Sequence, residues 1–203
     1  MTFGVRMGGR TFAPMDFQED LEQCLAVLAR GGLIVYPTDT IWGIGCDATN
    51  AEAVARIYAL KQRAESKSMI VLVGDERDVL KYTAGVDLHL FDYLKTASKP
   101  TTVIYEGAIG LAPNLLAEDG SVGIRIVGEP FCRHLVKRLK RPLVSTSANI
   151  SGQPAPGCFA EIAPDIKKRV DYVVRYRQED KERNTPSAVV KWGRDGKVEV
   201  IRP

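Results

Sequence analysis

The sequence is poor in the residues on which many enzymes and metal proteins depend. It has two histidines, His89 and His134, and four cysteines that stand far apart without a CxxC pair. A Ser–His–Asp triad, a histidine-rich metal site and a disulfide framework are therefore disfavoured, and the cysteine usage favours a reducing, cytoplasmic setting. No apolar run approaches the ~20 residues of a membrane span, so no membrane association is expected. The GxxxxGK[ST] and GxGxxG motifs of common nucleotide-binding folds are also missing.

The composition fits one soluble globular domain. The chain has 203 residues, of which 45% are hydrophobic and 26% charged, close to average soluble usage. A chain of this size can bury a core of its own. We therefore predict a single domain over residues 1–203, with residues 1–15 as an N-terminal extension. The net charge of +3 is too small to indicate a partner.

Helices alternate with short apolar strands along the chain, a pattern typical of an α/β fold. Asp16 and Glu19 resemble a capping box, and Asp195-Gly196 predicts the turn of a final hairpin. Further helices are expected to begin near Asn50, Asp75, Asp87, Pro130 and Ala160. Strands are expected over residues 33–36, 69–73, 101–105, 121–127, 143–147, 172–174, 187–192 and 197–202. Residues 175–185 are charged, carry almost no apolar side chain and are expected to be mobile.

Lys61 falls on the apolar stripe of its predicted helix, seven residues after Val54 and four after Ile57. Taken alone, this position favours a lysine that extends its ammonium group to solvent near a helix C-terminus. The alternative is a cation with a role at a site, because Arg63 and Lys67 follow closely.

The predicted strand 121–126 has one apolar and one polar face. Ser121, Gly123 and Arg125 alternate with apolar residues, so they share a face. Such a face can be a floor for an anionic ligand close to the backbone, or simply an exposed sheet surface. The pattern alone leaves both interpretations open.

Hydroxyl-rich segments lie where apolar strands end or begin, at residues 37–40, 145–152 and 185–187. Turn-rich loops have the same composition. However, ligands of open α/β sheets bind beyond strand ends. Hydroxyl groups and cations together favour a polyanion such as ATP.

These segments resemble the YrdC-like family of threonylcarbamoyl-AMP synthases, from about Asp16 to the C-terminus. YPTDTIWGIGCDA, at residues 36–48, is similar to the family's PT[DE]TxYGLGxxA signature. Lys61-Gln62-Arg63 is similar to its K-x-R element, Ser121–Arg125 to its V-x-x-R strand, and Ser147-Ala148-Asn149 to its S-x-N element. TPSAVV and VIRP resemble its final substrate-binding segments.

The sequence departs from the family pattern at three places. Trp42 stands where Tyr or Phe is usual, SKPTTVI replaces a W-P-G-P-x-T segment, and Pro186-Ser187-Ala188 replaces E-S-T. The third change keeps the serine and loses a carboxylate. The extra C-terminal domain of longer members has no room in this sequence.

The resemblance implies an open, twisted, mixed sheet with helices on both faces around a basic cavity. It also implies the reaction of L-threonine, bicarbonate or CO2, and ATP to threonylcarbamoyl-AMP and pyrophosphate. A separate transferase complex would then use the product to modify tRNA. Magnesium is expected on the phosphates, held mainly by substrate oxygens and water, with no protein ligand predicted.

Matching the motifs residue by residue gives a set of candidate site residues. The implied ATP contacts are Arg63, Lys67, Ser121, Ser147, Arg202 and, through its backbone, Ala155. The implied threonine contacts are Thr40, Leu72, Arg125, Ser145 and Ser187. The candidate catalytic residues are Lys61, Arg63, Ser147 and Asn149.

Two other interpretations stay open at this point. One is a non-catalytic module that binds tRNA or double-stranded RNA through clustered cations, although such clusters are usually solvated helix faces. These cations are Arg133, Lys137, Arg138, Lys140, Arg141 and residues 167–169. The other is a paralogue of the same fold with different chemistry, with a carbamoyl-transfer module as a remoter form of it.

Overall fold

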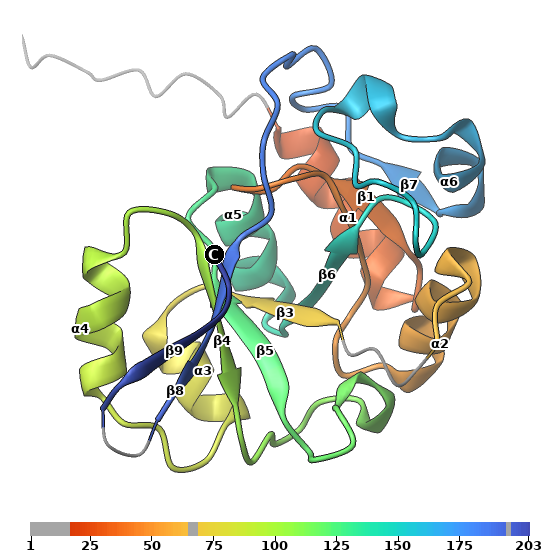
Figure 1. Cartoon of the computed structure of the whole chain (residues 1–203). Coiled ribbons are helices and arrows are strands. Elements are labelled where there is room, and N and C mark those ends of the chain that lie inside the picture. The colour runs from red at the N-terminus through yellow and green to blue at the C-terminus, as the bar shows by residue number, and fades with distance from the viewer. Residues whose placement is uncertain (1–16, 65–68, 194–195) are drawn as a thin grey trace, which may run out of the picture.

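The computed structural model describes residues 17–64, 69–193 and 196–203. Its helices are α1 (Gln18–Ala29), α2 (Ala51–Lys61), α3 (Glu76–Tyr82), α4 (His89–Thr96), α5 (Pro130–Leu139) and α6 (Pro164–Arg169), with short 3-10 turns η1 (Pro113–Leu115) and η2 (Phe159–Glu161). Its strands are β1 (Ile34–Tyr36), β2 (Gly43–Gly45), β3 (Ile70–Val73), β4 (Thr101–Tyr105), β5 (Val122–Ile126), β6 (Leu143–Ser147), β7 (Tyr172–Val173), β8 (Ala188–Trp192) and β9 (Val198–Arg202). Figure 1 shows their arrangement.

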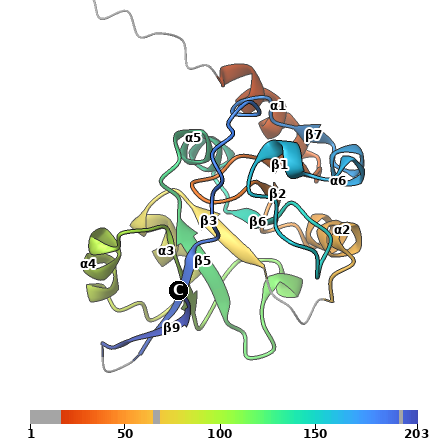
Figure 2. The same cartoon turned by 45° about the horizontal axis from the view of Figure 1, so that its top comes forward.

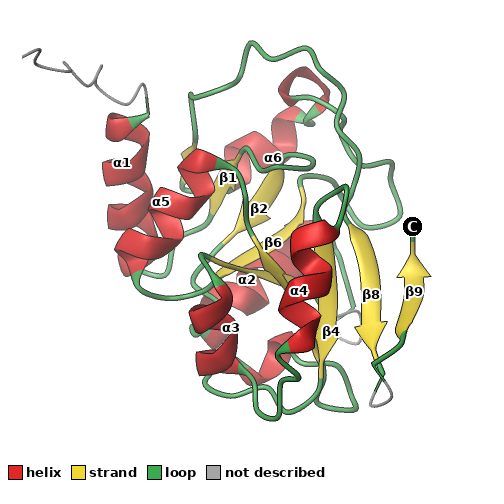
Figure 3. Ribbon diagram, turned by 90° about the vertical axis from the view of Figure 1, so that its left-hand side faces the viewer, coloured by secondary structure: helices red, strands yellow, loops and turns green. Residues whose placement is uncertain are grey.

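The nine strands form one mixed sheet in the order β7-β1-β2-β6-β3-β5-β4-β8-β9. The pairs β1–β7, β3–β5 and β4–β8 are parallel, and the others are antiparallel. Helices α1, α3, α4 and α5 lie in front of the sheet in Figure 3, and α2 and α6 lie behind it. The predicted α/β class and mixed sheet are confirmed.

Local sequence signals account for most helix starts. The side chains of Asn50, Asp75 and Glu129 each accept a hydrogen bond from a backbone N–H in the first turn of α2, α3 and α5. Pro130 is the first residue of α5, where its missing N–H costs nothing. Asp16 and Asp195 lie outside the described residues, so neither the capping box nor the full hairpin turn can be compared.

One prediction about local structure is wrong, and one strand was not predicted. The expected helix near residues 160–168 is the turn η2 followed by α6, because Pro164 can begin a helix but cannot continue one. Strand β2 was not predicted, since a three-residue segment with two glycines is a weak strand signal. Gly45 is needed there: a Cβ atom at this position would lie 2.5 Å from the Val144 carbonyl oxygen.

The segment between β7 and β8 carries no helix or strand. It runs from the end of the molecule that holds α1 and β7 to the start of β8 (Figures 1 and 2). Asp20 of α1 is buried and fixes the beginning of this segment, since its carboxylate accepts hydrogen bonds from the Tyr172 hydroxyl (2.6 Å) and from the backbone N–H groups of Arg175 and Tyr176 (3.0 and 2.8 Å). No helix in the described part of the chain has the length and apolarity to cross a bilayer.

Candidate functional site

A cavity of about 240 Å³ brings the ends of several strands together, and its lining is cationic and rich in hydroxyl groups. Eight of the predicted site residues line it: Thr40, Arg63, Arg125, Ser145, Ser147, Ala155, Ser187 and Arg202. All its charged lining residues are arginines, and no carboxylate belongs to the described lining. Such a lining suits an anionic ligand better than a neutral or cationic one.

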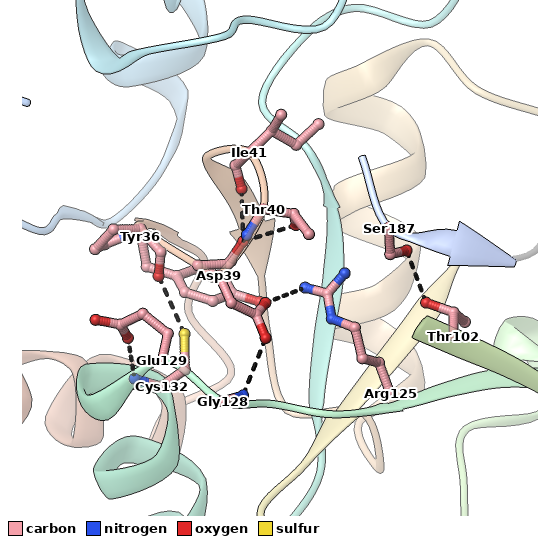
Figure 4. Close-up of polar contacts among 12 residues, drawn as sticks. Tyr36, Asp39, Thr40, Ile41, Thr102, Arg125, Gly128, Glu129, Cys132 and Ser187 are labelled. Carbon is pink, nitrogen blue, oxygen red and sulfur yellow. Dashed lines mark hydrogen bonds and ion pairs between the residues drawn. The ribbon is translucent and has the colours of Figure 1, made fainter. Parts of the chain in front are cut away.

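Arg125 forms part of the floor of this cavity, which we call the arginine cavity. It lies on β5 and is only 2% exposed, so the interpretation of its strand face as an exposed surface is wrong. Its Nη2 lies 3.0 Å from Oδ1 of Asp39 (Figure 4). Its Nε and Nη2 are buried without a well-oriented hydrogen-bond acceptor among the described residues. A buried guanidinium in this state is available for a ligand carboxylate or phosphate.

The other two arginines approach the cavity from different parts of the chain. Arg202, at the end of β9, donates from Nε and Nη2 to the Ser187 carbonyl oxygen at 3.1 and 2.9 Å. Burial lowers the pKa of Arg202, and the positive charge of Arg125 lowers it further. Burial also lowers the pKa of Arg63. A bound anion would relieve the repulsion between these cations.

The turn after β1 presents the Thr40 hydroxyl in a defined state. The Thr38 hydroxyl donates its proton to the Ile41 carbonyl oxygen (2.8 Å) and accepts from the Thr40 backbone N–H (2.9 Å). The two threonine hydroxyl oxygens are 2.9 Å apart, so Thr40 must donate in that contact. Thr40 therefore offers only lone pairs to the cavity and can accept from an N–H or O–H group of a ligand.

Ser187 lies on the opposite side of Arg125 from Asp39 (Figure 4). Its hydroxyl is buried and lies 2.9 Å from the Thr102 hydroxyl of β4. Thr102 was not singled out from the sequence, because only the parallel pairing of β4 with β8 brings it to Ser187.

Lys61 lies behind the cavity wall instead of in its lining. It is 1% exposed, so the interpretation as a lysine that reaches solvent is wrong. Its ammonium group donates to the Ser147 and Asn149 carbonyl oxygens and to Oδ1 of Asn149, which uses all three of its protons. The Ser147 hydroxyl also donates to Oδ1 of Asn149. Lys61 thus fixes the loop that carries the predicted S-x-N element.

The pKa of Lys61 reflects this position. Burial lowers it to about 7, and the nearby charge of Arg63 contributes. Lys61 therefore titrates close to neutral pH, where a change in the charge of the cavity can alter its protonation.

Two other described residues of the predicted set, Ser121 and Leu72, do not line the arginine cavity. Ser121 is buried at the start of β5, and its backbone N–H donates to Oδ1 of Asp119. Leu72 is fully buried on β3, opposite Arg125 in the strand register. Lys67 lies outside the described residues.

A larger cavity, of about 890 Å³, includes Asp39 in its lining. Its lining mixes Lys95, Lys99 and Arg133 with the carboxylates Asp75 and Glu76. Lys95 already pairs with Glu76. The smaller cavity is the better candidate site, because its charge is of one sign and its hydroxyl groups converge.

The cations of α5 that suggested an RNA-binding surface are exposed. Arg133, Lys137, Arg138 and Lys140 all have exposed side chains. This exposure fits a solvated helix face as well as a nucleic-acid contact, and RNA binding stays a prediction.

Comparison with known proteins agrees with these observations. The family model Sua5_yciO_yrdC, described as "Telomere recombination", matches residues 26–203. The threonylcarbamoyl-AMP synthase of Pseudoalteromonas translucida is 29% identical over 187 residues, which cover 91% of this chain and 98% of that protein. The enzyme of the same name from Xanthomonas campestris is 35% identical over 165 residues, 79% of this chain and 87% of the relative.

Solved structures show the same fold. The crystal structure of E. coli YciO has a TM-score of 0.78 at 25% identity, covering 91% of this chain and 89% of that one. P. abyssi Sua5 complexed with L-threonine has a TM-score of 0.78 at 20% identity and covers 91% of this chain. The present chain spans 54% of that Sua5 chain, or about half its length.

Proposed function

The chain belongs to the Sua5/YciO/YrdC family, and we propose that it is an L-threonylcarbamoyladenylate synthase. It forms threonylcarbamoyl-AMP and pyrophosphate from L-threonine, bicarbonate or CO2, and ATP, as a nucleotidyltransferase. One observation carries this proposal: three arginines and several hydroxyl groups surround a cavity whose described lining contains no carboxylate. The relatives named threonylcarbamoyl-AMP synthase, and the likeness to Sua5 in complex with L-threonine, support it.

The substrates are strongly anionic, so bringing them together is mainly an electrostatic task. A unit charge pair at ~4 Å contributes about 4 kcal/mol at an effective dielectric constant near 20. Arg63 and Arg202 hold the phosphates of ATP, together with the Ser147 hydroxyl and the backbone at Ala155. Lys67 and Ser121 are further ATP contacts that the family motifs imply. Lys61 supports the binding of ATP indirectly, because it fixes the loop that carries Ser147 and Asn149.

Arg125 binds the carboxylate of threonine, because its guanidinium is buried and lacks a well-oriented acceptor. Thr40 accepts from the amine or the hydroxyl of the amino acid, since its own proton is used by Thr38. Ser145 and Ser187 complete the polar wall, and Leu72 supports it from β3. A site that bonds to a substrate hydroxyl rejects analogues that lack it.

The chemistry requires positioning more than acid–base catalysis. The neutral threonine amine adds to CO2 and releases a proton to water, or reacts with bicarbonate with loss of water, and in both cases becomes a carbamate. A carbamate oxygen then forms a bond to the α-phosphorus of ATP, and the bond from that phosphorus to the bridging oxygen breaks to release pyrophosphate. Charge stabilisation and alignment dominate such a transfer. This agrees with a cavity that holds arginines and no histidine.

Magnesium enters this scheme as the counter-ion of ATP. The described lining offers hydroxyl oxygens but no carboxylate, and the described residues contain no cluster of three or more carboxylate, cysteine or histidine ligands. The fit to a dedicated protein cage for the ion is therefore poor, and phosphate oxygens and water would hold it.

The product is a reactive mixed anhydride, so a separate enzyme must consume it quickly. We propose that a tRNA threonylcarbamoyl-transferase complex in the cytoplasm does so, and that tRNA itself is a further possible partner. We also propose that residues 1–203 form a single domain with an N-terminal extension over residues 1–15.

The experiment is a pyrophosphate-release assay in which each substrate is omitted in turn. We expect release only when threonine, bicarbonate and ATP are all present, and a much lower rate with valine. Pyrophosphate release without threonine, or an equal rate with valine, would contradict the proposal. RNA binding that falls steeply with salt, without any threonine-dependent release, would favour the RNA-binding alternative instead.

A further inference from the structure

Asp39 contacts the arginine cavity from outside its lining. It lies in the turn after β1, between Thr38 and Thr40, the latter being part of the lining. Its Oδ1 is 3.0 Å from Nη2 of Arg125, and its Oδ2 accepts from the Gly128 backbone N–H at 3.0 Å (Figure 4). One carboxylate therefore joins the side chain of β5 to the backbone that leads into α5.

Asp39 and Arg125 form an ion pair, although Nη2 of Arg125 and Oδ1 of Asp39 do not form a well-oriented hydrogen bond. Asp39 is the only carboxylate within ion-pair distance of Arg125 among the described residues. Arg202 adds a repulsive charge nearby, since burial and then the charge of Arg125 lower the pKa of Arg202. Without Asp39, a buried guanidinium would be left with no counter-ion, which is strongly unfavourable.

Asp39 and Arg125 line different cavities. Arg125 belongs to the lining of the arginine cavity, and Asp39 and Gly128 belong to the lining of the larger cavity. One terminal nitrogen of Arg125 is held by Asp39, and the other points away from it, on the side of Ser187 (Figure 4).

We propose that Asp39 is a positioning residue for recognition of the amino-acid substrate. It holds Arg125 so that the free edge of the guanidinium faces the arginine cavity and receives the substrate carboxylate. This inference rests on the proposed function, since it assigns Asp39 to the binding of threonine and not to that of ATP. An aligned guanidinium gives two parallel hydrogen bonds to a carboxylate, and a rotated one loses them.

The test is the D39N variant, which removes the charge and keeps an oxygen for the Gly128 N–H. We expect the KM for threonine to rise at least tenfold, with the KM for ATP within twofold of the wild-type value. The double variant D39N/R125M separates positioning from a general structural role. If Asp39 acts through Arg125, D39N has no further effect on the threonine KM in the R125M background. The proposal would be overturned if D39N left the threonine KM unchanged, or if D39N raised the threonine KM as strongly in R125M as in the wild type.

A second measurement does not depend on catalysis. The Nε–H of Arg125 is expected to give a sharp, slowly exchanging ¹⁵N NMR signal in the wild type, which broadens or shifts to the solvent-exposed position in D39N. If D39N does not fold, D39S provides the same comparison. An identical signal in the wild type and the variant would contradict the role of Asp39 even if the protein made no pyrophosphate. If D39N loses the ordered Arg125 signal and the wild type shows no threonine-dependent pyrophosphate release, only the proposed reaction is refuted.

Discussion

Replacement of Arg125 by lysine tests how the arginine cavity binds its amino acid. Lysine keeps one positive charge opposite Asp39 but carries a single nitrogen, so it cannot form the paired hydrogen bonds of a guanidinium. Because Arg125 is 2% exposed, water cannot replace the lost contact easily. A hydrogen bond to a charged group contributes roughly 1.5–3 kcal/mol, and each 1.4 kcal/mol corresponds to about tenfold. The KM for threonine should therefore rise roughly 10- to 150-fold.

The assay is the initial rate of pyrophosphate release at saturating ATP and bicarbonate, with threonine varied. R138K is a matched control, since Arg138 is exposed on α5 and does not line the arginine cavity. It should leave both KM values unchanged. The reasoning would be refuted if R125K kept the wild-type threonine KM, or if the KM values for threonine and ATP rose equally while the thermal unfolding temperature stayed the same.

Three further predictions concern charge, anchoring and packing. The pKa of Lys61 is about 7 without ligand, and a bound polyanion should raise this pKa. ATP binding is therefore accompanied by uptake of a proton, and the affinity of the wild type for ATP should fall as the pH rises above 7. The arginine of K61R stays charged, so the ATP affinity of this variant should not fall in this way when dissociation constants are measured between pH 7 and 9. Equal dependence on pH in the wild type and K61R would show that Lys61 is not the titrating group. D20A leaves three donors without their acceptor and should lower the free energy of unfolding by about 3 kcal/mol in urea titrations. A loss below about 0.5 kcal/mol would show that Asp20 does not stabilise the segment between β7 and β8. G45A places a Cβ against the Val144 carbonyl oxygen and should lower the free energy of unfolding by about 2 kcal/mol or more in the same titration. An unchanged free energy of unfolding would show that β2 can shift to accept the Cβ and would contradict the prediction.

The fold was predictable wherever the signal was local. Asn50, Asp75 and Pro130 mark helix starts by capping chemistry, and the ranges of β4 and β6 agree with their apolar runs. Strand β2 and the break before α6 were missed because long-range packing and a single proline decide them. The mixed character of the sheet was not derivable from periodicity and came from the family resemblance, and the strand order was not predicted.

In the candidate site too, local sequence patterns predicted some features, whereas long-range contacts determine the others. The alternation of β5 raised the possibility that Arg125 faces a ligand, and the motifs added the serines and threonines of the cavity. The contact of Asp39 with Arg125 joins residues 86 positions apart (125 minus 39), so no local pattern could reveal it. Lys61 was correctly placed on the apolar side of α2, but the acceptors that hold it come from Ser147 at the end of β6 and from Asn149 in the loop that follows. The roles of these residues in catalysis stay predictions.

The most direct test of the central claim is to identify the nucleotide product. The protein would be incubated with ATP, ¹³C-bicarbonate and ¹⁵N-threonine, and the nucleotides analysed by mass spectrometry together with the released pyrophosphate. The account predicts one adenylate, a mixed anhydride of AMP, that carries both a ¹³C and a ¹⁵N label and is formed in equal amount to pyrophosphate. An adenylate with ¹⁵N but no ¹³C, or no labelled adenylate at all, would contradict it.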